Sequence, residues 1–499
     1  MSTQSASGVS LTTYSYENFQ GLDTSRDITS LDTGEEQHLV KLENGYCDWR
    51  GQVVRDPTVA HRIGSQKVVH VNFYGKNKVV YVEEDGAGIN FKSDDGHYLD
   101  AVHPIGSTLS SVVFNQSVQI VCRGRAPYIY DGSSFARNPS NDLNTLTPAF
   151  VTSTQRRMVV AGIPGRETQV HLSRVDNESI FPDDEAKNSN SVLRAGFIDV
   201  ANLLGTADQI TGLGSFEQNR LAVFTADRAI IYKIDPSIDN WIIDDDTFIN
   251  IGCASHNTIC NAGTDMMFCS RSGIHSIKRS EENGILVYSY SLSDKIDILY
   301  RELFASVDDP QRISAVFDQD NAQYHIFFPQ SGDVLCKRLT LALNPEGGEP
   351  QPKFNTGDFL NARCGSFLGG LLVLGTSGGV YNVNQIENET GTVPTLNIMT
   401  PLLWHGSLTD TKDTHSVIIQ AAGKGTITME AQDLDGNQIG SLLFEVDDTT
   451  DDNYFVGVPL SKQYERKWSY RYKAAQYSFK AEGGGGVLRL IGFAVNVKK

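Results

Sequence analysis

The sequence predicts an all-β protein: a β-propeller of six or seven blades, a C-terminal antiparallel β-sandwich and an extended N-terminal arm. Three observations predict this class. Seven short stretches share one hairpin plan, they recur at a roughly constant spacing, and longer alternating strands replace them after about residue 400. A chain of 499 residues can hold a repeat array with an appended domain. We therefore expect the arm at 1–58, the propeller at 59–400 and the sandwich at 401–499.

The first segment of the chain is rich in Ser, Thr, Asp and Gly. This composition indicates an extended arm, with one strand near His38–Asn44. The segment lacks a basic stretch followed by an apolar one, so we expect no secretory signal. No run in the chain approaches the ~18 apolar residues that a membrane helix needs.

The hairpin plan is clearest where two apolar runs, Leu221–Phe224 and Ala229–Tyr232, flank the polar break Thr225–Arg228. Two β-prone runs separated by turn-forming residues are typical of paired strands. An isolated hairpin cannot bury its apolar face, whereas hairpins stacked radially as blades can. The plan occurs at residues 67–86, 117–132, 157–175, 219–235, 265–279, 323–339 and 370–384.

The turns of the seven hairpins start about 50 residues apart on average, which is the length of one four-stranded blade. Two intervals are longer. A polar insertion near 176–205 lengthens one, and a helix near 293–305 lengthens the other. Apolar residues recur at helical spacing from Ile296 to Leu303, behind a candidate N-cap at Ser293. Two or three unrelated β-sandwiches would show strands at similar spacing, and they stay the alternative.

The last hundred residues alternate polar and apolar side chains over longer strands. Trp468, Tyr470 and Tyr472 would then lie on one face of a sheet. Gly483–Gly486 would form a turn between strands. This pattern predicts the separate antiparallel sandwich.

Composition excludes some classes of function. The formal net charge of −18, from 42 basic and 60 acidic residues, argues against a protein that grips duplex DNA through a basic stripe. Seven cysteines form no Cys-x-x-Cys pair, so neither a zinc knuckle nor a redox motif is predicted. Cys253, Cys260 and Cys269 lie near apolar strand-like runs, and we expect buried thiols there rather than a metal site. Free thiols are typical of a reducing cytoplasm.

One motif has the form of a nucleophile. The segment Gly375–Gly379 matches Gly-x-Ser-x-Gly, which would make Ser377 catalytic. That motif needs a strained strand-to-helix turn, whereas the next residues, Val380–Val383, have the pattern of a strand. We therefore expect Ser377 in a hairpin turn without a catalytic role.

Carboxylates and histidines form no clear site either. The clusters at 433–437 and 242–248 lack the spacing of a calcium loop, and Asp-Gly is a common hairpin turn. We expect His256 and His275 to be structural residues, because no metal-binding spacing surrounds them. The polar segments at 35–38 and 182–185 are interpreted as solvated loops. Residues 388–390 have the form of a glycosylation acceptor, which has no meaning in a protein that is not secreted. No catalytic, metal-binding or cofactor-binding residue is predicted, and no cofactor.

Two regions of the chain resemble a known family. Residues 219–280 contain a strand pair ending in an aromatic residue, the segment Ile251-Gly252-Cys253, the apolar run Met266–Phe268 and the turn Gly273–Ile277. Together with residues 21–57, they resemble the tail nozzle proteins of short-tailed bacteriophages, also called tail tubular B-type or packaged-DNA stabilisation proteins.

The resemblance implies a structural, non-enzymatic protein of the virion tail, assembled in the host cytoplasm. Such proteins contain a propeller and form a ring, usually of six copies, below the portal and its adaptor, where tail fibres or tailspikes also attach. They retain packaged double-stranded DNA and conduct it at ejection without binding it specifically. The lumen of such a tube should avoid basic surface, because each phosphate that paired with Lys or Arg would add friction. Segments 176–205 and 340–357 are candidates for a gate, by length and polarity.

Two other functions are open to a propeller. A glycosidase, such as a capsule depolymerase of a tail, would need paired carboxylates on blade loops, and no sialidase-type Asp box occurs. A cellular interaction propeller would show Trp-Asp or recurring Gly-Gly signatures, and the chain has no Trp-Asp dipeptide. The nozzle function is the leading hypothesis, and the glycosidase is its alternative.

Overall fold

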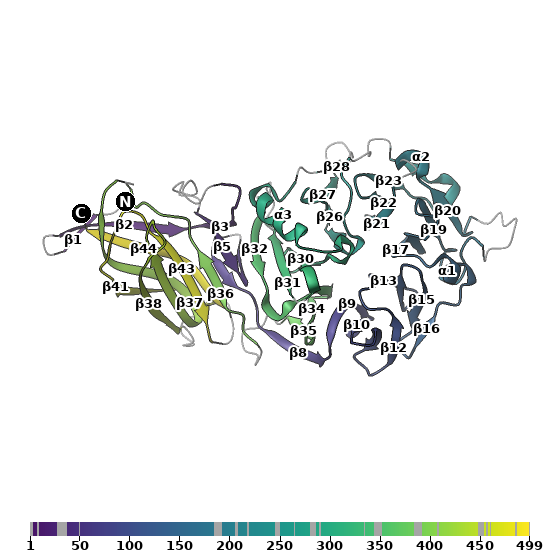
Figure 1. Cartoon of the computed structure of the whole chain (residues 1–499), viewed down its shortest axis with the longest axis horizontal. Helices are drawn as coiled ribbons and strands as arrows, with labels where there is room; N and C mark the ends of the chain where they lie inside the picture. Colours follow the sequence, from purple (N-terminus) through teal and green to yellow (C-terminus); the bar gives the residue numbers. More distant parts are fainter. Residues whose placement is uncertain are drawn as a thin grey trace.

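The computed structural model contains two parts side by side, a ring of short strands and a longer-stranded sheet assembly, as Figure 1 shows. The ring is a β-propeller, and the second part is a β-sandwich that holds both ends of the chain. None of the helices among the described residues is long and apolar enough to cross a membrane. The structure describes residues 3–6, 9–26, 37–48, 50–183, 192–204, 208–216, 219–244, 250–263, 265–279, 286–288, 291–333, 335–343, 352–383, 392–406, 409–447, 454–455, 458–459, 461–484 and 487–498.

Five blades follow one another along the chain, each an antiparallel sheet of four consecutive strands. They consist of β9 (Lys67–Tyr74), β10 (Lys78–Glu84), β11 (Ile89–Ser93) and β12 (Tyr98–His103); β13 (Leu109–Phe114), β14 (Ser117–Cys122), β15 (Arg125–Tyr130) and β16 (Phe135–Arg137); β17 (Phe150–Thr154), β18 (Arg157–Ala161), β19 (Gln169–Leu172) and β20 (Gly196–Asp199); β21 (Ile210–Phe216), β22 (Arg220–Thr225), β23 (Ala229–Lys233) and β24 (Ile242–Ile243); and β25 (Cys260–Ala262), β26 (Asp265–Cys269), β27 (Ile274–Arg279) and β28 (Leu286–Tyr288).

A sixth self-contained blade joins distant parts of the chain. It comprises β33 (Cys364–Leu368), β34 (Leu371–Thr376), β35 (Gly379–Val383) and β8 (Val59–Gly64). β8 precedes the first blade in sequence, yet it pairs antiparallel with β35 and so closes the ring. Gly379 permits this approach, because a Cβ at its φ of +132° would lie 2.2 Å from the Ile63 carbonyl oxygen.

A seventh four-stranded unit belongs to the ring and to the sandwich together. It comprises β29 (Ser314–Asp318), β30 (Gln323–Pro329), β31 (Cys336–Ala342) and β32 (Lys353–Gly357). Its outer strand β32 meets β5 (Lys41–Glu43) through the pair Thr356 and Glu43, and the sheet continues through β5 into the sandwich. Each of the seven predicted hairpins therefore lies in a different four-stranded unit, six of which are separate sheets.

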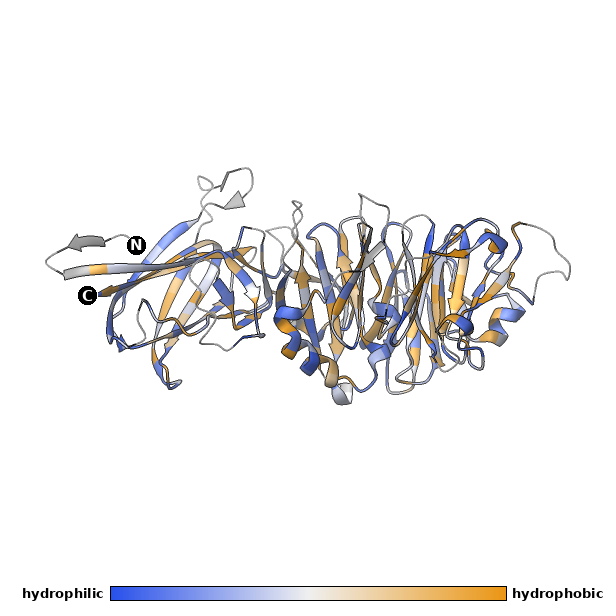
Figure 2. Cartoon of the chain, turned by 90° about the horizontal axis from the view of Figure 1, so that it is seen from above, coloured by the Kyte–Doolittle hydropathy of each residue, from blue (hydrophilic) through white to orange (hydrophobic). Residues whose placement is uncertain are grey.

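The middle strands of the blades explain why the hairpins are so apolar. All six residues of β22 are buried, and so are all residues of β14, β18 and β30. A blade lies between two neighbours, so both faces of its middle strands are covered and apolar residues occur without alternation. Figure 2 shows the strands of the ring side by side, with hydrophobic segments along them.

The sandwich is organised by one long strand, β37 (Lys412–Gln432). Its first half pairs with β41, β42 and β44, and its second half pairs with β38 and β43. The change of layer falls at Gly423, whose φ is +103° and whose Cβ would lie 2.0 Å from the Val487 carbonyl oxygen. The other strands here are β36 (Leu396–Met399), β38 (Gln438–Asp447), β39 (Tyr454–Phe455), β40 (Val458–Pro459), β41 (Lys462–Lys467), β42 (Arg471–Tyr472), β43 (Gln476–Glu482) and β44 (Leu488–Lys498).

The sandwich contains the aromatic cluster and the glycine segment that the sequence predicts. Trp468, Tyr470 and Tyr472 do lie together, with ring centroids 4.7 Å apart for the first pair and 5.0 Å for the second. Gly483 and Gly484 lie between β43 and β44 with positive φ, and the next two residues are outside the described part. The sandwich also contains β36, which begins before the predicted boundary at 401.

The N-terminal arm is extended and is built into the sandwich. Seven strands, rather than the one predicted, lie in it: β1 (Thr3–Ala6), β2 (Val9–Glu17), β3 (Phe19–Leu22), β4 (Gln37–Leu39), β5, β6 (Gly45–Cys47) and β7 (Val53–Arg55). β2 pairs with the last strand, β44. The prediction of a solvated loop at 35–38 is wrong for Gln37 and His38, which are buried in β4, because the packing partners of this segment come from distant sequence.

Helices are short and few among the described residues. The helix predicted near 293–305 is present as a 3-10 turn, η3 (Asp294–Ile296), followed by α3 (Asp297–Ala305). Ser293 does not cap it, because its Oγ accepts a hydrogen bond from the Ile274 backbone N–H instead. The others are α1 (Asn141–Leu146), α2 (Ala201–Leu204), η1 (Ile238–Asn240), η2 (His256–Thr258), η4 (Pro310–Arg312), η5 (Ser331–Asp333) and η6 (Phe359–Asn361).

The two segments predicted as gate candidates each contain a strand of a blade. Segment 176–205 contains β20 and α2, and segment 340–357 contains the end of β31 and all of β32. Residues 184–191, 205–207 and 344–351 lie outside the described residues. β20 and β32 are each hydrogen-bonded to a neighbouring strand, so the interpretation of both segments as simple loops is wrong for these strands. Polar composition misled it, because outer blade strands face solvent.

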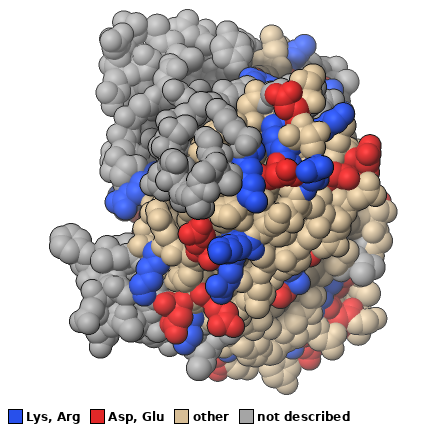
Figure 3. Space-filling view, turned by 90° about the vertical axis from the view of Figure 1, so that its left-hand side faces the viewer, with Lys and Arg blue, Asp and Glu red and all other residues tan. Residues whose placement is uncertain are grey.

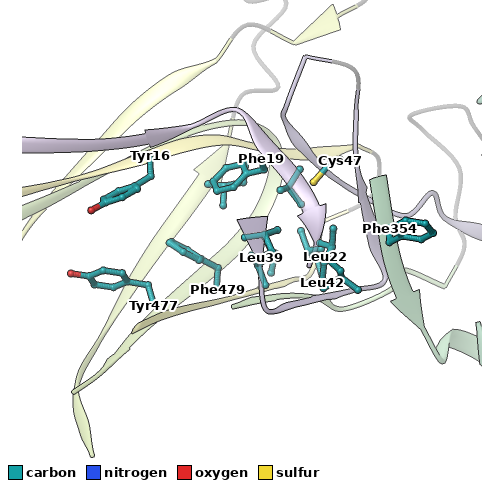
Figure 4. Close-up of a cluster of buried hydrophobic side chains, with 14 of the residues drawn as sticks. Tyr16, Phe19, Leu22, Leu39, Leu42, Cys47, Phe354, Tyr477 and Phe479 are labelled. Atoms are coloured by element: carbon teal, nitrogen blue, oxygen red, sulfur yellow. The ribbon is translucent and has the colours of Figure 1, made fainter. Parts of the chain in front are cut away.

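One hydrophobic core joins the propeller to the sandwich. In Figure 4, Leu22 and Leu42 of the N-terminal strands lie between Phe354 of β32 and Phe479 of β43. All four side chains are at most 2% exposed. Domains in one chain usually move relative to each other unless a large hydrophobic interface holds them. The shared core and the shared sheet therefore fix the propeller on the sandwich.

Candidate functional site

The propeller surrounds a central cavity of about 380 Å³. All seven four-stranded units contribute their inner strands to it: β9, β13, β17, β21, β25, β29 and β33. The cavity is therefore the axis of the ring. It is the first place where a propeller could hold a ligand, because blade edges converge there.

The lining of the central cavity is polar but uncharged. No Lys, Arg, Asp or Glu is among its lining residues. His70 Nε2 lies 2.7 Å from Ser111 Oγ, and the Asn72 side-chain amide donates to the same oxygen at 2.8 Å. Burial lowers the pKa of His70 to about 4, so the ring is neutral near pH 7. These side chains satisfy one another, and they supply neither a charged acid–base pair nor an activated nucleophile.

His256 connects blades through both of its ring nitrogens. Its Nε2–H donates to the Val151 carbonyl of β17 at 3.2 Å, and its Nδ1 accepts from the Leu213 backbone N–H of β21 at 3.2 Å. Burial lowers the pKa of His256 to about 4, which keeps the imidazole neutral with one donor and one acceptor. The prediction of a structural role is confirmed by this geometry.

His275 and the Gly273 turn have a similar structural role. His275 Nε2 lies 3.2 Å from Ser272 Oγ, in the turn between β26 and β27. A Cβ at Gly273, with φ +149°, would lie 2.5 Å from the Oγ atoms of Ser291 and Ser293. The turn that begins at Gly273 therefore packs closely against Ser291 and Ser293, and glycine is required at its first position.

Ser377 lies in the two-residue turn between β34 and β35, exposed to solvent. Thr376 Oγ1 closes this turn, because it accepts from the Gly378 N–H at 3.1 Å and donates to the Gly379 carbonyl at 3.0 Å. A strand follows the turn, as predicted. The strand-to-helix geometry that a serine nucleophile needs is absent here.

The cluster around Asp433 forms a turn, whereas Asp244 is paired with an arginine. Asp433 Oδ1 accepts from the backbone N–H groups of Asp435 and Asn437, which lowers the pKa of Asp433. Asp244 accepts from Arg220 Nε at 3.0 Å, and the Asp183 backbone N–H donates to Asp142. The rest of 242–248, beyond Asp244, and residues 184–185 and 388–390 lie outside the described residues.

The cysteines are free thiols in the structure. Burial raises the pKa of Cys253, Cys260 and Cys269 to about 12, so these sulfurs are protonated near neutral pH. Cys260 is half-buried and the other two are buried. No group of three His, Cys, Asp or Glu residues that could hold a metal occurs in the described part of the chain. The full set is Cys47, Cys122, Cys253, Cys260, Cys269, Cys336 and Cys364.

A second cavity, of about 230 Å³, lies where the propeller meets the sandwich; we name it the junction pocket. Its lining comes from β6, β7, β8, β29, β30, β31, β34, β35 and β44 and from the segment after β7. Asp56 and Arg338 form a buried ion pair in it. Sequence reasoning missed this pocket, because its walls come from segments up to about 440 residues apart and no local motif marks them.

The chain is a propeller protein with an attached β-sandwich, and these two cavities are its candidate sites. No family model matches the chain, and no curated protein matches it either. Solved structures do resemble it. Virginiamycin B lyase from Staphylococcus aureus is 8% identical with a TM-score of 0.39, over 64% of this chain and 94% of that one.

Two further structures give similar values. BamB from Moraxella catarrhalis is 8% identical with a TM-score of 0.36, over 68% of this chain and 100% of that one. YCF48 from Cyanidioschyzon merolae is 10% identical with a TM-score of 0.36, over 66% of this chain and 98% of that one. At such values the likeness concerns the overall fold only, and the activity in a neighbour's name is a property of that neighbour.

Proposed function

We propose that this chain is a structural subunit of the tail nozzle of a short-tailed bacteriophage, present as a ring of copies, usually six. The ring would extend the tail tube below the portal and adaptor, retain packaged double-stranded DNA and conduct it during ejection. The observation that carries the proposal is the core and sheet shared by the propeller and the sandwich. A wall that retains packaged DNA must resist deformation, and a shared core leaves no soft hinge between the two parts.

The size of the central cavity supports a conduit between copies rather than through one copy. The major groove of DNA is by itself about 12 Å wide, so the whole duplex is wider still. A cavity of about 380 Å³ is too small for a duplex to pass through. The DNA would therefore pass through a lumen that several subunits enclose. A closed ring of identical subunits is the simplest such assembly.

The charge of the molecule supports a surface that does not hold DNA. The net charge is −18. Figure 3 shows the sandwich end, where Lys and Arg are interspersed with Asp and Glu and form no broad basic field over the coloured part of that face. Basic surface would pair with phosphates and release counterions, which would slow sliding. A mixed or acidic lumen lets the genome move.

The alternative function, a propeller glycosidase, needs two carboxyl groups free to act on a glycosidic bond. The junction pocket has two lining carboxylates, and both are already engaged. Asp56 pairs with Arg338, and Asp318 accepts from the Asn321 side-chain amide and from two backbone N–H groups. No observation therefore favours this alternative.

Negative-stain electron microscopy of the purified protein tests the proposal. We expect rings with a central opening, and we expect an antibody against the protein to label the tail of the particle that carries it. Sedimentation at increasing protein concentration should show the same assembly in solution. A protein that stays monomeric at every concentration and salt, and that antibody does not find on tails, would contradict the nozzle function.

A further inference from the structure

The junction pocket has the composition of a ligand site that is independent of the proposed nozzle function. Its buried wall is apolar and comes from Val54, Val59, Leu372 and Leu374, which are at most 6% exposed. Its rim is half-buried and includes Tyr46, so the pocket opens to solvent. An apolar wall with a few polar groups at a domain boundary is typical of small-molecule sites.

The charges that line the pocket do not balance. Three arginines and two aspartates line it, which leaves one positive charge in excess. Arg338 pairs with Asp56, and Arg55 donates to the carbonyl oxygens of Gly483 and Gly484 at 2.8 and 3.1 Å. A pocket with this excess favours an anion.

Arg489 of β44 has neither the ion pair of Arg338 nor the carbonyl partners of Arg55 among the described residues. No carboxylate lies within ion-pair distance of its guanidinium among the described residues, and its Nε is buried without a hydrogen-bond partner there. A buried Nε–H that makes no hydrogen bond is costly, and a carboxylate can accept two parallel hydrogen bonds from a guanidinium group. The site therefore offers a cation with unused donors.

Two neutral side chains add further hydrogen-bonding groups. Gln323 lines the pocket at 5% exposure, and its side-chain amide has no partner among the described residues. His325, also 5% exposed, uses Nδ1 on Thr340 Oγ1 at 2.9 Å, and its Nε2 has no partner there. Burial, helped by Arg338, lowers the pKa of His325 to about 3, so the ring is neutral near pH 7.

Tyr46 completes the polar side of the pocket next to Arg489. Burial, and then the Asp56 carboxylate, raise the pKa of Tyr46 to about 12, whereas Arg489 acts in the opposite direction. The phenol is therefore protonated near neutral pH and can donate to an anion. Asp56 and Asp318, the two acidic groups that face the same space, are held by the partners already described.

We propose that the junction pocket binds a small organic monocarboxylate, with the carboxylate on Arg489 and the apolar body against the valine and leucine wall. A single excess charge suits one carboxylate better than a dianionic phosphate. The Gln323 amide would orient the head group. Because the ligand would contact strands of both the propeller and the sandwich, its binding would also stabilise their junction.

Benzoate and its uncharged isostere benzamide test the proposal by isothermal titration calorimetry on the full chain. Both share a ring that suits the apolar wall, and only benzoate carries the carboxylate. We expect benzoate to bind more tightly than benzamide by about tenfold or more. We also expect benzoate, and not benzamide, to raise the unfolding temperature.

Substitutions of Arg489 distinguish a loss of ligand binding from a loss of folding. Arg489→Gln should remove the preference for benzoate, and Arg489→Lys should restore part of it because the charge returns. Gln323→Leu, which keeps the volume, should weaken benzoate without abolishing the preference. Arg301→Gln, which changes an arginine on the exposed side of α3, is the matched control and should bind as the parent does. Unfolding curves without ligand show that each variant is folded.

Three results would overturn the proposal: no binding of benzoate at millimolar concentration, equal binding of benzoate and benzamide, or an unchanged preference in folded Arg489→Gln. None of these results bears on ring assembly. Failure of the ligand site and failure of the nozzle function are therefore distinguishable.

Discussion

The blade β21–β24 and the unit β29–β32 have the same four-stranded antiparallel plan, but only the first is complete in itself. All strands of β21–β24 lie between Ile210 and Ile243, and each pairs with its neighbour in sequence. The outer strand of β29–β32 instead meets β5, more than 300 residues earlier in the chain. The same module thus serves as an isolated blade or as the connection to a second domain, and its outer strand decides which.

The largest effect is expected from removing a buried aromatic side chain from each module. Phe354 in β32 and Phe224 in β22 are 1% and 0% exposed. Replacing either by Ala should cost about 3–5 kcal/mol of unfolding free energy, because a large cavity is left. Phe354→Ala should also make the sandwich and the propeller unfold separately in urea, whereas Phe224→Ala should not. A Phe354→Ala protein of unchanged stability would show that the shared core does not support the structure.

Two buried arginines extend the comparison to hydrogen bonds. Arg55 joins an N-terminal strand to the carbonyls at the end of β43, and Arg157 donates to four backbone carbonyls within and beside the blade β17–β20. Substitution by Met should cost about 2–4 kcal/mol at each site, since these carbonyls lose their charged donors. Arg55→Met should increase proteolysis at the junction, and Arg157→Met should not. Equal cleavage patterns in the two variants would show that Arg55 does not hold the junction more than Arg157 does.

Acid should weaken the whole structure, chiefly through the buried histidines of the propeller. Burial lowers the pKa of His70, His103, His171 and His256 to about 4 and that of His325 to about 3, all in the propeller, whereas the described sandwich has His405 at about 3. Unfolded histidine binds a proton below about pH 6.5 and these folded ones do not until about pH 4 or lower, so stability falls as pH decreases through that window.

A single histidine isolates this effect. His256→Phe should flatten the dependence of unfolding free energy on pH between 6.5 and 4 by up to about 1.4 kcal/mol per pH unit. Urea titrations at several pH values measure the slope. An unchanged slope in the variant would mean that His256 is not buried in its neutral form.

The smallest effect is expected in the turn of the closing blade. Ser377 is exposed, and the side-chain hydrogen bonds that close its turn are made by Thr376. Ser377→Ala should change the unfolding free energy by less than about 0.5 kcal/mol. Ring assembly should also be unaffected. A large loss of either would show a role for the hydroxyl that the turn geometry does not explain.

The sequence predicted the features that depend on neighbouring residues and missed those that depend on pairing between distant strands. Leu221–Phe224 and Ala229–Tyr232 form a hairpin from their own residues, so the seven modules and the all-β class were predictable. The pairing of β8 with β35 and of β5 with β32 depends on residues hundreds of positions apart, and no local pattern encodes it. The junction pocket was missed for the same reason.

The candidate residues divide in the same way. Ser377 and Asp433 could be placed in turns from their immediate neighbours, because turn chemistry is local. The pairing partners of His256, Val151 and Leu213, come from other blades, so only a structural role in general could be predicted. Arg489 carried no signal at all, because an unpaired cation becomes informative only once its surroundings are known.

The central claim is that the propeller and the sandwich form one cooperative unit. Trp241 packs against the core of the blades and Trp468 against the core of the sandwich. Urea unfolding followed by fluorescence tests the claim most directly, in two variants that each keep only one of the chain's four tryptophans, either Trp241 or Trp468. If propeller and sandwich unfold together, the two probes will show coincident midpoints. Two transitions at separate urea concentrations would contradict it.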